Sequence, residues 1–131
     1  MAKKLLLRLT KIKKASYLSR AIRIVRENHL FVAGWMLNNW MDTPSNIERM
    51  VLCRCGKKAV AVGIVLKKQE YHGYPNTGIF VKPSHRRQGI GTKILKQLSK
   101  TKIPLKVAYG TTPSINFYDK YKKDLNLHIL Y

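Results

Sequence analysis

Hydrophobic and polar positions follow two distinct periods along this chain, and the period changes from one segment to the next. Apolar residues at helical spacing indicate helices, whereas short alternating or continuous β-branched runs indicate strands. The pattern predicts, in chain order, a strand at 4–10, helices at 16–29 and 29–42, strands at 48–55, 58–68 and 77–81, a helix at 91–100, a strand at 104–109, a helix at 112–121 and a strand at 125–131. This β-α-α-β-β-β-α-β-α-β order predicts an α/β fold with a mixed central sheet, partly antiparallel and partly parallel, flanked by helices.

Glycine and proline residues mark the turns between these elements. Gly56-Lys57, set between two apolar runs, predicts a β-hairpin, and segment 71–78 is a further turn. Pro83 stops the strand that follows that turn. No repeat, low-complexity tract or linker interrupts the order, and 131 residues with 45% apolar composition suffice for one core. We therefore expect a single domain over residues 1–131.

The N-terminus and the cysteines exclude several classes of protein. The apolar run Leu5–Leu7 is too short for a signal-peptide core, and no run reaches the roughly 18 apolar residues of a membrane helix. We therefore expect a cytoplasmic protein. Cys53 and Cys55 have no second Cys or His pair at ligand spacing, so we expect ordinary reduced cysteines and no metal site.

Charge is the strongest feature of the composition. The chain has 26 Lys and Arg against 6 Asp and Glu, a formal net charge of +20. Residues 1–26 hold nine basic residues and no acid, and residues 82–106 hold eight and no acid. Such a balance predicts attraction to polyanions such as RNA, DNA or nucleotide cofactors. A solvated basic face is the plainer alternative.

One of these basic stretches has the form of a phosphate site. Segment "HRRQGIGTKIL" (85–95) places two glycines between a predicted strand and a predicted helix. The first amides of a helix have no partner inside the helix, and the helix dipole adds positive potential there. Gly89 and Gly91 permit a close backbone approach, and Arg86, Arg87 and Lys93 add charge around the turn. The spacing predicts an anion site for a phosphate or pyrophosphate.

The longer stretch "IFVKPSHRRQGIGTKIL" resembles motif A of the GNAT superfamily of N-acetyltransferases, whose signature is Gln/Arg-x-x-Gly-x-Gly/Ala. The positions of that signature are Arg86, Arg87, Gln88, Gly89, Ile90 and Gly91. The predicted order of elements is also similar to the family's topology. The resemblance implies an acyltransferase that uses acetyl-CoA, with the cofactor's pyrophosphate on the amides of the loop as far as Thr92. It also implies that the strand with Phe80 and Val81 is splayed from its neighbour by a bulge. Its main chain would then pair with the pantetheine arm and the acetyl carbonyl.

The same resemblance points to an acid for the reaction. The family's last helix commonly carries a tyrosine in a Tyr-x-x-x-Gly-Phe context, whose hydroxyl protonates the sulfur of CoA. Tyr118 matches that position, although Lys122-Lys123 stand where Gly-Phe is usual. Tyr121 is the alternative acid, a packed helix aromatic is the structural alternative for Tyr118, and Asn116 is a candidate contact of the cofactor arm.

A general base is harder to identify. Acetyl transfer needs a neutral amine, and a primary amine is mostly protonated at neutral pH. Family members often use a Glu on or before the cofactor strand, which makes Glu70 the candidate base, with His72 two residues further on. A surface ion pair for Glu70, or a water chain with no dedicated base, stays open.

The charge bears on the acceptor as well. Cofactor phosphates do not account for the nine basic residues of 1–26, so we expect a primary amine on a nucleic-acid-associated acceptor, such as aminoacyl-tRNA or a protein bound to nucleic acid. The alternative is a catalytically degenerate GNAT-fold protein that acts as a basic RNA-, DNA- or protein-binding module. We expect no membrane partner and a monomer or homodimer.

Overall fold

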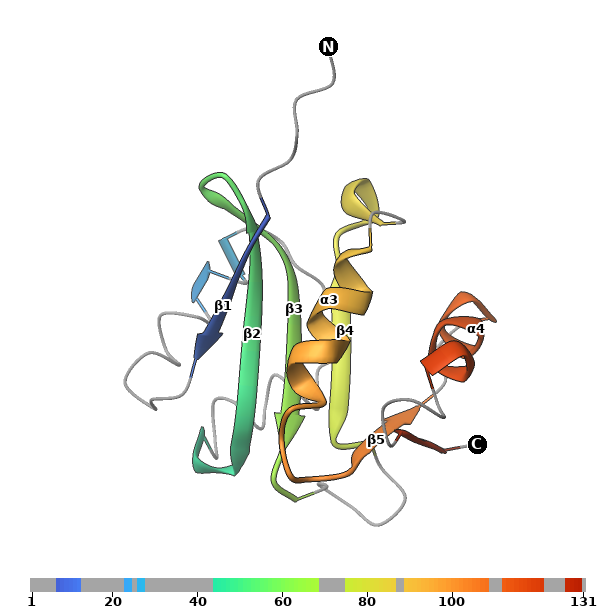
Figure 1. Cartoon of the computed structure of the whole chain (residues 1–131). Helices are drawn as coiled ribbons and strands as arrows, with labels where there is room; N and C mark the ends of the chain where they lie inside the picture. Colours follow the sequence, from blue (N-terminus) through green and yellow to red (C-terminus); the bar gives the residue numbers. More distant parts are fainter. Residues whose placement is uncertain are drawn as a thin grey trace.

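We analysed a computed structural model of the chain, which describes residues 7–12, 23–24, 26–27, 44–68, 75–86, 89–108, 112–121 and 127–130. Figure 1 shows an antiparallel sheet with a helix across one face and a smaller β unit beside it. Among the described residues, no helix combines the length and the apolar character needed to cross a membrane.

The larger sheet has four antiparallel strands in the order β1-β2-β3-β4. They are β1 (Leu7–Ile12), β2 (Ile47–Cys55), β3 (Lys58–Leu66) and β4 (Thr77–Val81), and a short 3-10 helix, η1 (Pro44–Asn46), precedes β2. After Lys58 every residue of β3 is buried, because the strand lies between two neighbours and both of its faces are covered. This explains why its sequence is a continuous β-branched run rather than an alternating one.

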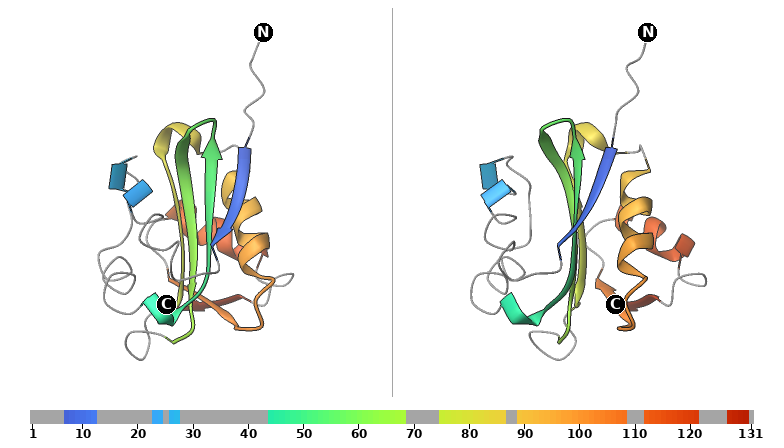
Figure 2. Two further views of the ribbon diagram at one scale, coloured as in Figure 1. Left: turned by 90° about the vertical axis from the view of Figure 1, so that its left-hand side faces the viewer. Right: turned by 60° about the vertical axis from the view of Figure 1, so that its left-hand side comes forward.

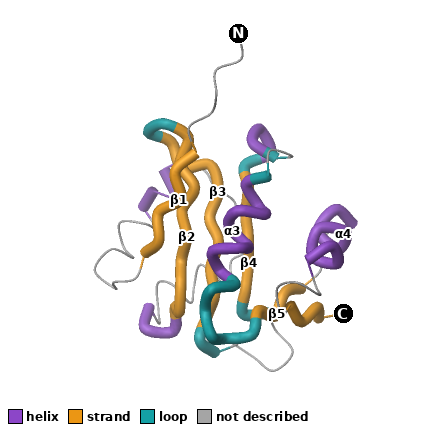
Figure 3. The backbone as a smooth tube through the Cα atoms, in the orientation of Figure 1, coloured by secondary structure: helices purple, strands orange, loops and turns teal. Residues whose placement is uncertain are grey.

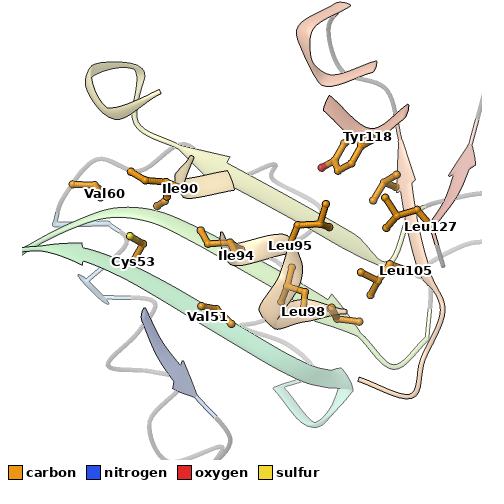
Figure 4. Packing of buried hydrophobic residues seen from close by; sticks show 13 residues of the cluster. Val51, Cys53, Val60, Ile90, Ile94, Leu95, Leu98, Leu105, Tyr118 and Leu127 are labelled. Carbon is orange, nitrogen blue, oxygen red and sulfur yellow. The ribbon is translucent and has the colours of Figure 1, made fainter. Parts of the chain in front are cut away.

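Helix α3 (Ile90–Leu98) covers one face of this sheet, and a 3-10 helix, η2 (Pro83–His85), leads into it from β4. Its apolar stripe packs on β2 and β3 in the core cluster that Figure 4 shows. The buried stripe of α3 consists of Ile90, Ile94, Leu95 and Leu98. Gly63 of β3 lies directly beneath, where a Cβ would overlap Ile94 Cγ2 and come within 3.0 Å of Leu98 Cδ1. The absence of a side chain at Gly63 therefore sets how closely α3 approaches the sheet.

The opposite face of the sheet is also covered. Its fully buried side chains are Met50, Leu52, Val62, Ile64 and Leu66. The described helical residues at 23–24 and 26–27 lie on this side, across the sheet from α3, as both views of Figure 2 show. The sheet is thus the middle layer of a three-layer arrangement.

A second, parallel pair of strands follows α3. It consists of β5 (Leu105–Ala108) and β6 (Leu127–Leu130), with α4 (Thr112–Tyr121) between them in the sequence. Figure 3 shows this pair beside the lower end of β4, and the right-hand view of Figure 2 shows α4 on the same side of the sheet as α3. A strand, a helix and a parallel strand form the usual right-handed crossover unit of α/β proteins.

The predicted fold class is confirmed. The Gly56-Lys57 hairpin, the strand at 77–81 and the helix at 112–121 form as the sequence predicts. The strand predicted at 4–10 is confirmed from Leu7 and continues to Ile12, where it pairs with β2 from Leu7 opposite Cys55 to Ile12 opposite Met50, while residues 4–6 lie outside the described residues. The predicted helix at 29–42 lies outside the described residues.

The strands divide into two sheets rather than one continuous sheet. The bulge predicted for the strand with Phe80 and Val81 is absent from its pairing with β3, where residues 77–81 oppose 61–65 one to one. The shifts of register lie in β2 instead, near Ile47 and Cys53.

Candidate functional site at the edge of strand β4

Strand β4 is the outer strand of the large sheet, and the ladder decides which of its backbone groups are free. The Lys82 N–H donates to Val60 C=O at 2.8 Å, so this pair is of the hydrogen-bonded type. Hydrogen-bonded and non-hydrogen-bonded pairs alternate along an antiparallel ladder. The backbone groups of Phe80 therefore face Val62 of β3, whereas those of Ile79 and Val81 point outward. Within the described part of the chain, no strand pairs with this outer edge.

The chain after β4 leads into the N-terminus of helix α3. Gly89 is the N-cap of α3 with φ 76°, a left-handed conformation that glycine adopts without strain. The first helical hydrogen bond runs from Lys93 N–H to Gly89 C=O at 3.1 Å. The preceding amides, those of Ile90, Gly91 and Thr92, have no acceptor inside the helix. These three N–H groups and the helix dipole together are suited to bind an anion, and we refer to them as the candidate anion site.

Basic side chains stand around this N-terminus. Arg86 is exposed, and its Nε donates to the outward-facing Val81 C=O at 3.2 Å. Lys93 is exposed in the next turn of α3, and Lys82 is half-buried at the end of β4. Arg86 therefore holds its guanidinium at the outer edge of β4, just before the start of α3.

Helix α4 is fixed against the first turns of α3 by two contacts, and the aromatic rings of α4 also pack on one another. A Cβ at Gly91 would lie 3.4 Å from Phe117 Cζ, so the ring packs against the backbone there. The hydroxyls of Thr92 and Tyr121 form a hydrogen bond of 3.0 Å. Phe117 also packs edge-on against Tyr118 and Tyr121, with ring centroids 5.2 and 5.5 Å apart. These contacts fix the position of α4, and hence of its tyrosines, relative to the anion site.

Tyr118 lies inward on α4. It is 7% exposed and belongs to the core cluster under α3. Its hydroxyl forms no hydrogen bond with the described residues, and Figure 4 shows it directed from α4 toward the β4 side. Burial raises the pKa of Tyr118 to about 12, because the phenolate loses its hydration. The phenol is therefore a protonated donor at neutral pH.

The comparison with family models decides the identity of this arrangement. The model of the acetyltransferase (GNAT) domain matches residues 46–122, which include the free edge of β4, the anion site and α4. The chain belongs to the GNAT family of acetyltransferases. Its enzyme class is that of a GNAT acyltransferase, with acetyl-CoA as the acetyl donor and an amine as the acceptor.

A solved structure agrees with this GNAT fold. The chain is similar to the aminoglycoside N-acetyltransferase AAC(6')-Iy in complex with CoA, with a TM-score of 0.53, 13% identity and coverage of 100% of this chain and 93% of that one. It is also similar to a GCN5-related N-acetyltransferase from Ralstonia eutropha, with a TM-score of 0.48, 15% identity and coverage of 87% and 90%. No curated protein sequence matches the chain.

Several residues that the sequence selects meet at this GNAT site, and several lie outside the description. The structure places Gly89, Ile90, Gly91 and Thr92 at the start of α3, Arg86 just before it, Phe80 and Val81 on β4, and Tyr118 on α4 in the core cluster. Glu70, His72, Arg87 and Gln88 lie outside the described residues, and of Asn116 only its place in α4 is described. No group of three or more potential metal-ligating side chains occurs in the part of the chain that the structure describes.

Two positions of the site were not found by sequence reasoning. Ile79 offers outward backbone groups, and Asn76 joins β4 to β5. Whether the backbone groups of Ile79 face β3 or point outward depends on the register of β4 against β3, and no local sequence pattern reveals that register. Asn76 lies in a segment that the sequence predicts as a turn, where asparagine is common, so its type gave no distinguishing signal.

Proposed function

We propose that acetyl-CoA binds along the outer edge of β4 with its pyrophosphate on the N-terminus of α3, and that the acetyl group passes directly to a primary amine. The observation that carries this proposal is that the outer edge of β4 leads along the chain into the N-terminus of α3. The outward backbone of Ile79 and Val81 leads, through η2, to the left-handed Gly89 and the free amides of α3. An extended amide-containing arm that ends in a pyrophosphate matches this sequence of donors and acceptors.

The transfer step needs two proton movements. The amine nitrogen attacks the thioester carbonyl, the new N–C bond forms, and the C–S bond breaks as the sulfur leaves with its electron pair. Tyr118 supplies a proton to that sulfur, and the surplus proton of the amine passes to a base, for which Glu70 is our candidate. Outward N–H groups of β4 stabilise the charge that develops on the carbonyl oxygen.

The pKa of Tyr118 constrains how it acts. A thiol ordinarily has a pKa of ~8.5, so complete proton transfer from a phenol with a pKa of about 12 costs about 5 kcal/mol. This cost excludes a free phenolate as a lasting intermediate. Tyr118 therefore donates a strong hydrogen bond to the sulfur in the transition state, and any proton it releases is replaced at once.

A pair of glycine variants tests the cofactor site. Gly89 and Gly56 both have positive φ, of 76° and 64°, and a Cβ at either one meets nothing within 4 Å. Gly89→Glu and Gly56→Glu thus carry similar backbone strain and the same charge, but only the first places a carboxylate at the anion site. We expect Gly89→Glu to abolish the binding of acetyl-CoA in isothermal titration calorimetry and Gly56→Glu to retain it. Equal loss in both variants would contradict the proposed site.

The acceptor is proposed from the charge at the same end of the sheet. Figure 1 shows the tip of the β2–β3 hairpin, η2 and the start of α3 at this end. The basic residues there are Arg54, Lys57, Lys58, Lys82, Arg86 and Lys93. Residues 49–118 contain one acidic residue, Glu70, which falls in the sequence between β3 and β4 and lies outside the described residues. This excess exceeds what the phosphates of CoA neutralise, and it supports an acceptor attached to RNA or DNA.

A charge-matched comparison tests the acceptor. The variant with Lys57→Gln and Lys58→Gln removes two exposed charges at the hairpin, and the variant with Lys100→Gln and Lys102→Gln removes two beyond the other end of α3. We expect the hairpin variant to lower the slope of log K against log salt for tRNA binding by about 1.4, at roughly 0.7 for each of the two lost phosphate contacts. The control pair should change the slope little. Equal slopes in all three proteins would refute a nucleic-acid surface at the hairpin, and label from acetyl-CoA appearing only in small molecules would refute the acceptor class.

A further inference from the structure

Asn76 lies where β3, β4 and β5 meet, immediately before β4. It is 3% exposed, and its neighbour Thr77 is equally buried. The side-chain Nδ2 donates to Pro104 C=O at 3.0 Å and more weakly to Leu66 C=O at 3.4 Å. The side-chain Oδ1 accepts from Lys106 N–H at 2.7 Å and from the Thr77 hydroxyl at 2.8 Å. One buried amide thus connects three separate segments of the chain.

The side chain of Asn76 takes the place of a strand backbone beside β5. Its own N–H donates to Lys106 C=O at 3.0 Å, and its Oδ1 accepts from Lys106 N–H. In a continuing ladder, a backbone carbonyl of the next strand would accept from that N–H group. Because Asn76 Oδ1 already occupies this N–H group, β4 cannot use it to extend pairing along β5.

The backbone of Asn76 also changes direction. Its N–H points to Lys106 of β5, whereas its C=O accepts from Leu66 N–H of β3 at 2.8 Å. In a regular strand, the N–H and C=O of one residue point to the same side. The chain therefore turns at Asn76, and residues 77–81 pair with β3 alone. This is the structural cause of the separation of the two sheets that a bulge within β4 was expected to provide.

We propose that Asn76 is a positioning residue that ends the β4–β5 pairing and holds the two strands apart, so that the outward backbone groups of Ile79 and the outward N–H of Val81 stay open to the cofactor arm. This inference rests on the proposed binding of acetyl-CoA along β4. Without the amide, Lys106 N–H and Pro104 C=O lose these partners. In the variant, β5 can pair with the outer edge of β4 and so give these backbone groups new hydrogen-bond partners. That pairing would close the gap in which we place the pantetheine arm.

Two ligands separate positioning from a general loss of structure. Acetyl-CoA uses both the strand edge and the anion site, whereas adenosine 3′,5′-bisphosphate has no pantetheine arm and is confined to the phosphate region. For Asn76→Ala, we expect the Kd of acetyl-CoA to rise about ten-fold or more, as the loss of two or three backbone hydrogen bonds predicts. The Kd of the bisphosphate should stay within about two-fold of the wild-type value.

Thr77→Val is the matched control. It removes one buried hydrogen bond to Asn76 Oδ1 but retains every contact of Asn76 with Lys106 and Pro104. We expect it to bind both ligands like the wild type. If Asn76→Ala does not fold, Asn76→Ser, whose hydroxyl can retain one partner, is measured with the same two ligands.

Each outcome decides between the two proposals. Selective weakening of acetyl-CoA in the Asn76 variant supports the positioning role. Unchanged binding of acetyl-CoA, or equal weakening of both ligands, overturns that role while the proposed function stands. A wild-type protein that binds no acetyl-CoA overturns the proposed function and this inference with it.

Discussion

Gly63→Ala is the variant whose effect follows most directly from the packing of α3. The added Cβ would overlap Ile94 Cγ2 and lie 3.0 Å from Leu98 Cδ1. Both of these side chains are 0% exposed, so neither can swing into solvent to make room. The helix must therefore rise from the sheet, or the side chains must leave their preferred rotamers.

Two opposing terms set the magnitude for Gly63→Ala. Overpacking in a buried layer costs about 1–3 kcal/mol. Replacing glycine inside a strand lowers the entropy of the unfolded chain and returns about 0.5–1 kcal/mol. The net expectation is a loss of about 1–2 kcal/mol in the free energy of unfolding, since the steric term is the larger. Displacement of α3 also moves the amides at its N-terminus, so the affinity for acetyl-CoA should fall together with stability.

Urea unfolding measures this loss, and a double-mutant cycle assigns it to the contact. Ile94→Ala removes the Cγ2 atom and alone should cost about 2–5 kcal/mol, because it leaves a cavity. The methyl group of Gly63→Ala partly fills that cavity, so the double variant should be more stable than the sum of the single effects by about 1 kcal/mol or more. Additive effects, or a Gly63→Ala protein as stable as the wild type, would refute the close approach of α3 at this point.

Three further predictions concern the helices around the site. Tyr118→Phe should lower kcat by roughly 10²–10⁴-fold with little change in the Kd of acetyl-CoA. Burial raises the pKa of Tyr118 to about 12 from 10.0, so the wild type should lose up to about 3 kcal/mol of stability as pH rises from 10 to 12. The Tyr118→Phe variant should not show this loss. Thr92→Val and Tyr121→Phe should each destabilise by about 1 kcal/mol and be no worse in combination, because both remove the same hydrogen bond between α3 and α4. Arg49→Met should cost about 1–2 kcal/mol in thermal unfolding at low salt, because its guanidinium donates to Gln97 C=O at 2.7 Å at the negative end of α3. A Tyr118→Phe enzyme with wild-type turnover, additive losses at the Thr92–Tyr121 pair, or an unchanged melting temperature for Arg49→Met would each contradict the corresponding contact.

The sequence predicts more of the cofactor region than of the acceptor side. The glycines at 89 and 91 could be assigned to a phosphate turn because their surroundings are local: a strand ends just before them and a helix begins at once. The position of Tyr118 followed from the family resemblance, and the structure adds that it is buried beside α3 with a raised pKa. Glu70 has no such support, since its assignment rests on nearness in sequence to a strand and its segment lies outside the description.

The sequence by itself determined most of the described elements, the hairpin at Gly56-Lys57 and the glycine turn that begins α3 at Gly89, because each depends on periodicity or on the backbone freedom of a few neighbouring residues. Only the tertiary structure decided which side of β4 stays open. That outcome depends on the register of β4 against β3, on Gly63 beneath α3, and on the amide of Asn76, which reaches Lys106 thirty positions away. A pattern of local hydrophobicity contains no information about such partners, because asparagine in a turn and asparagine between two strands have the same local sequence preferences.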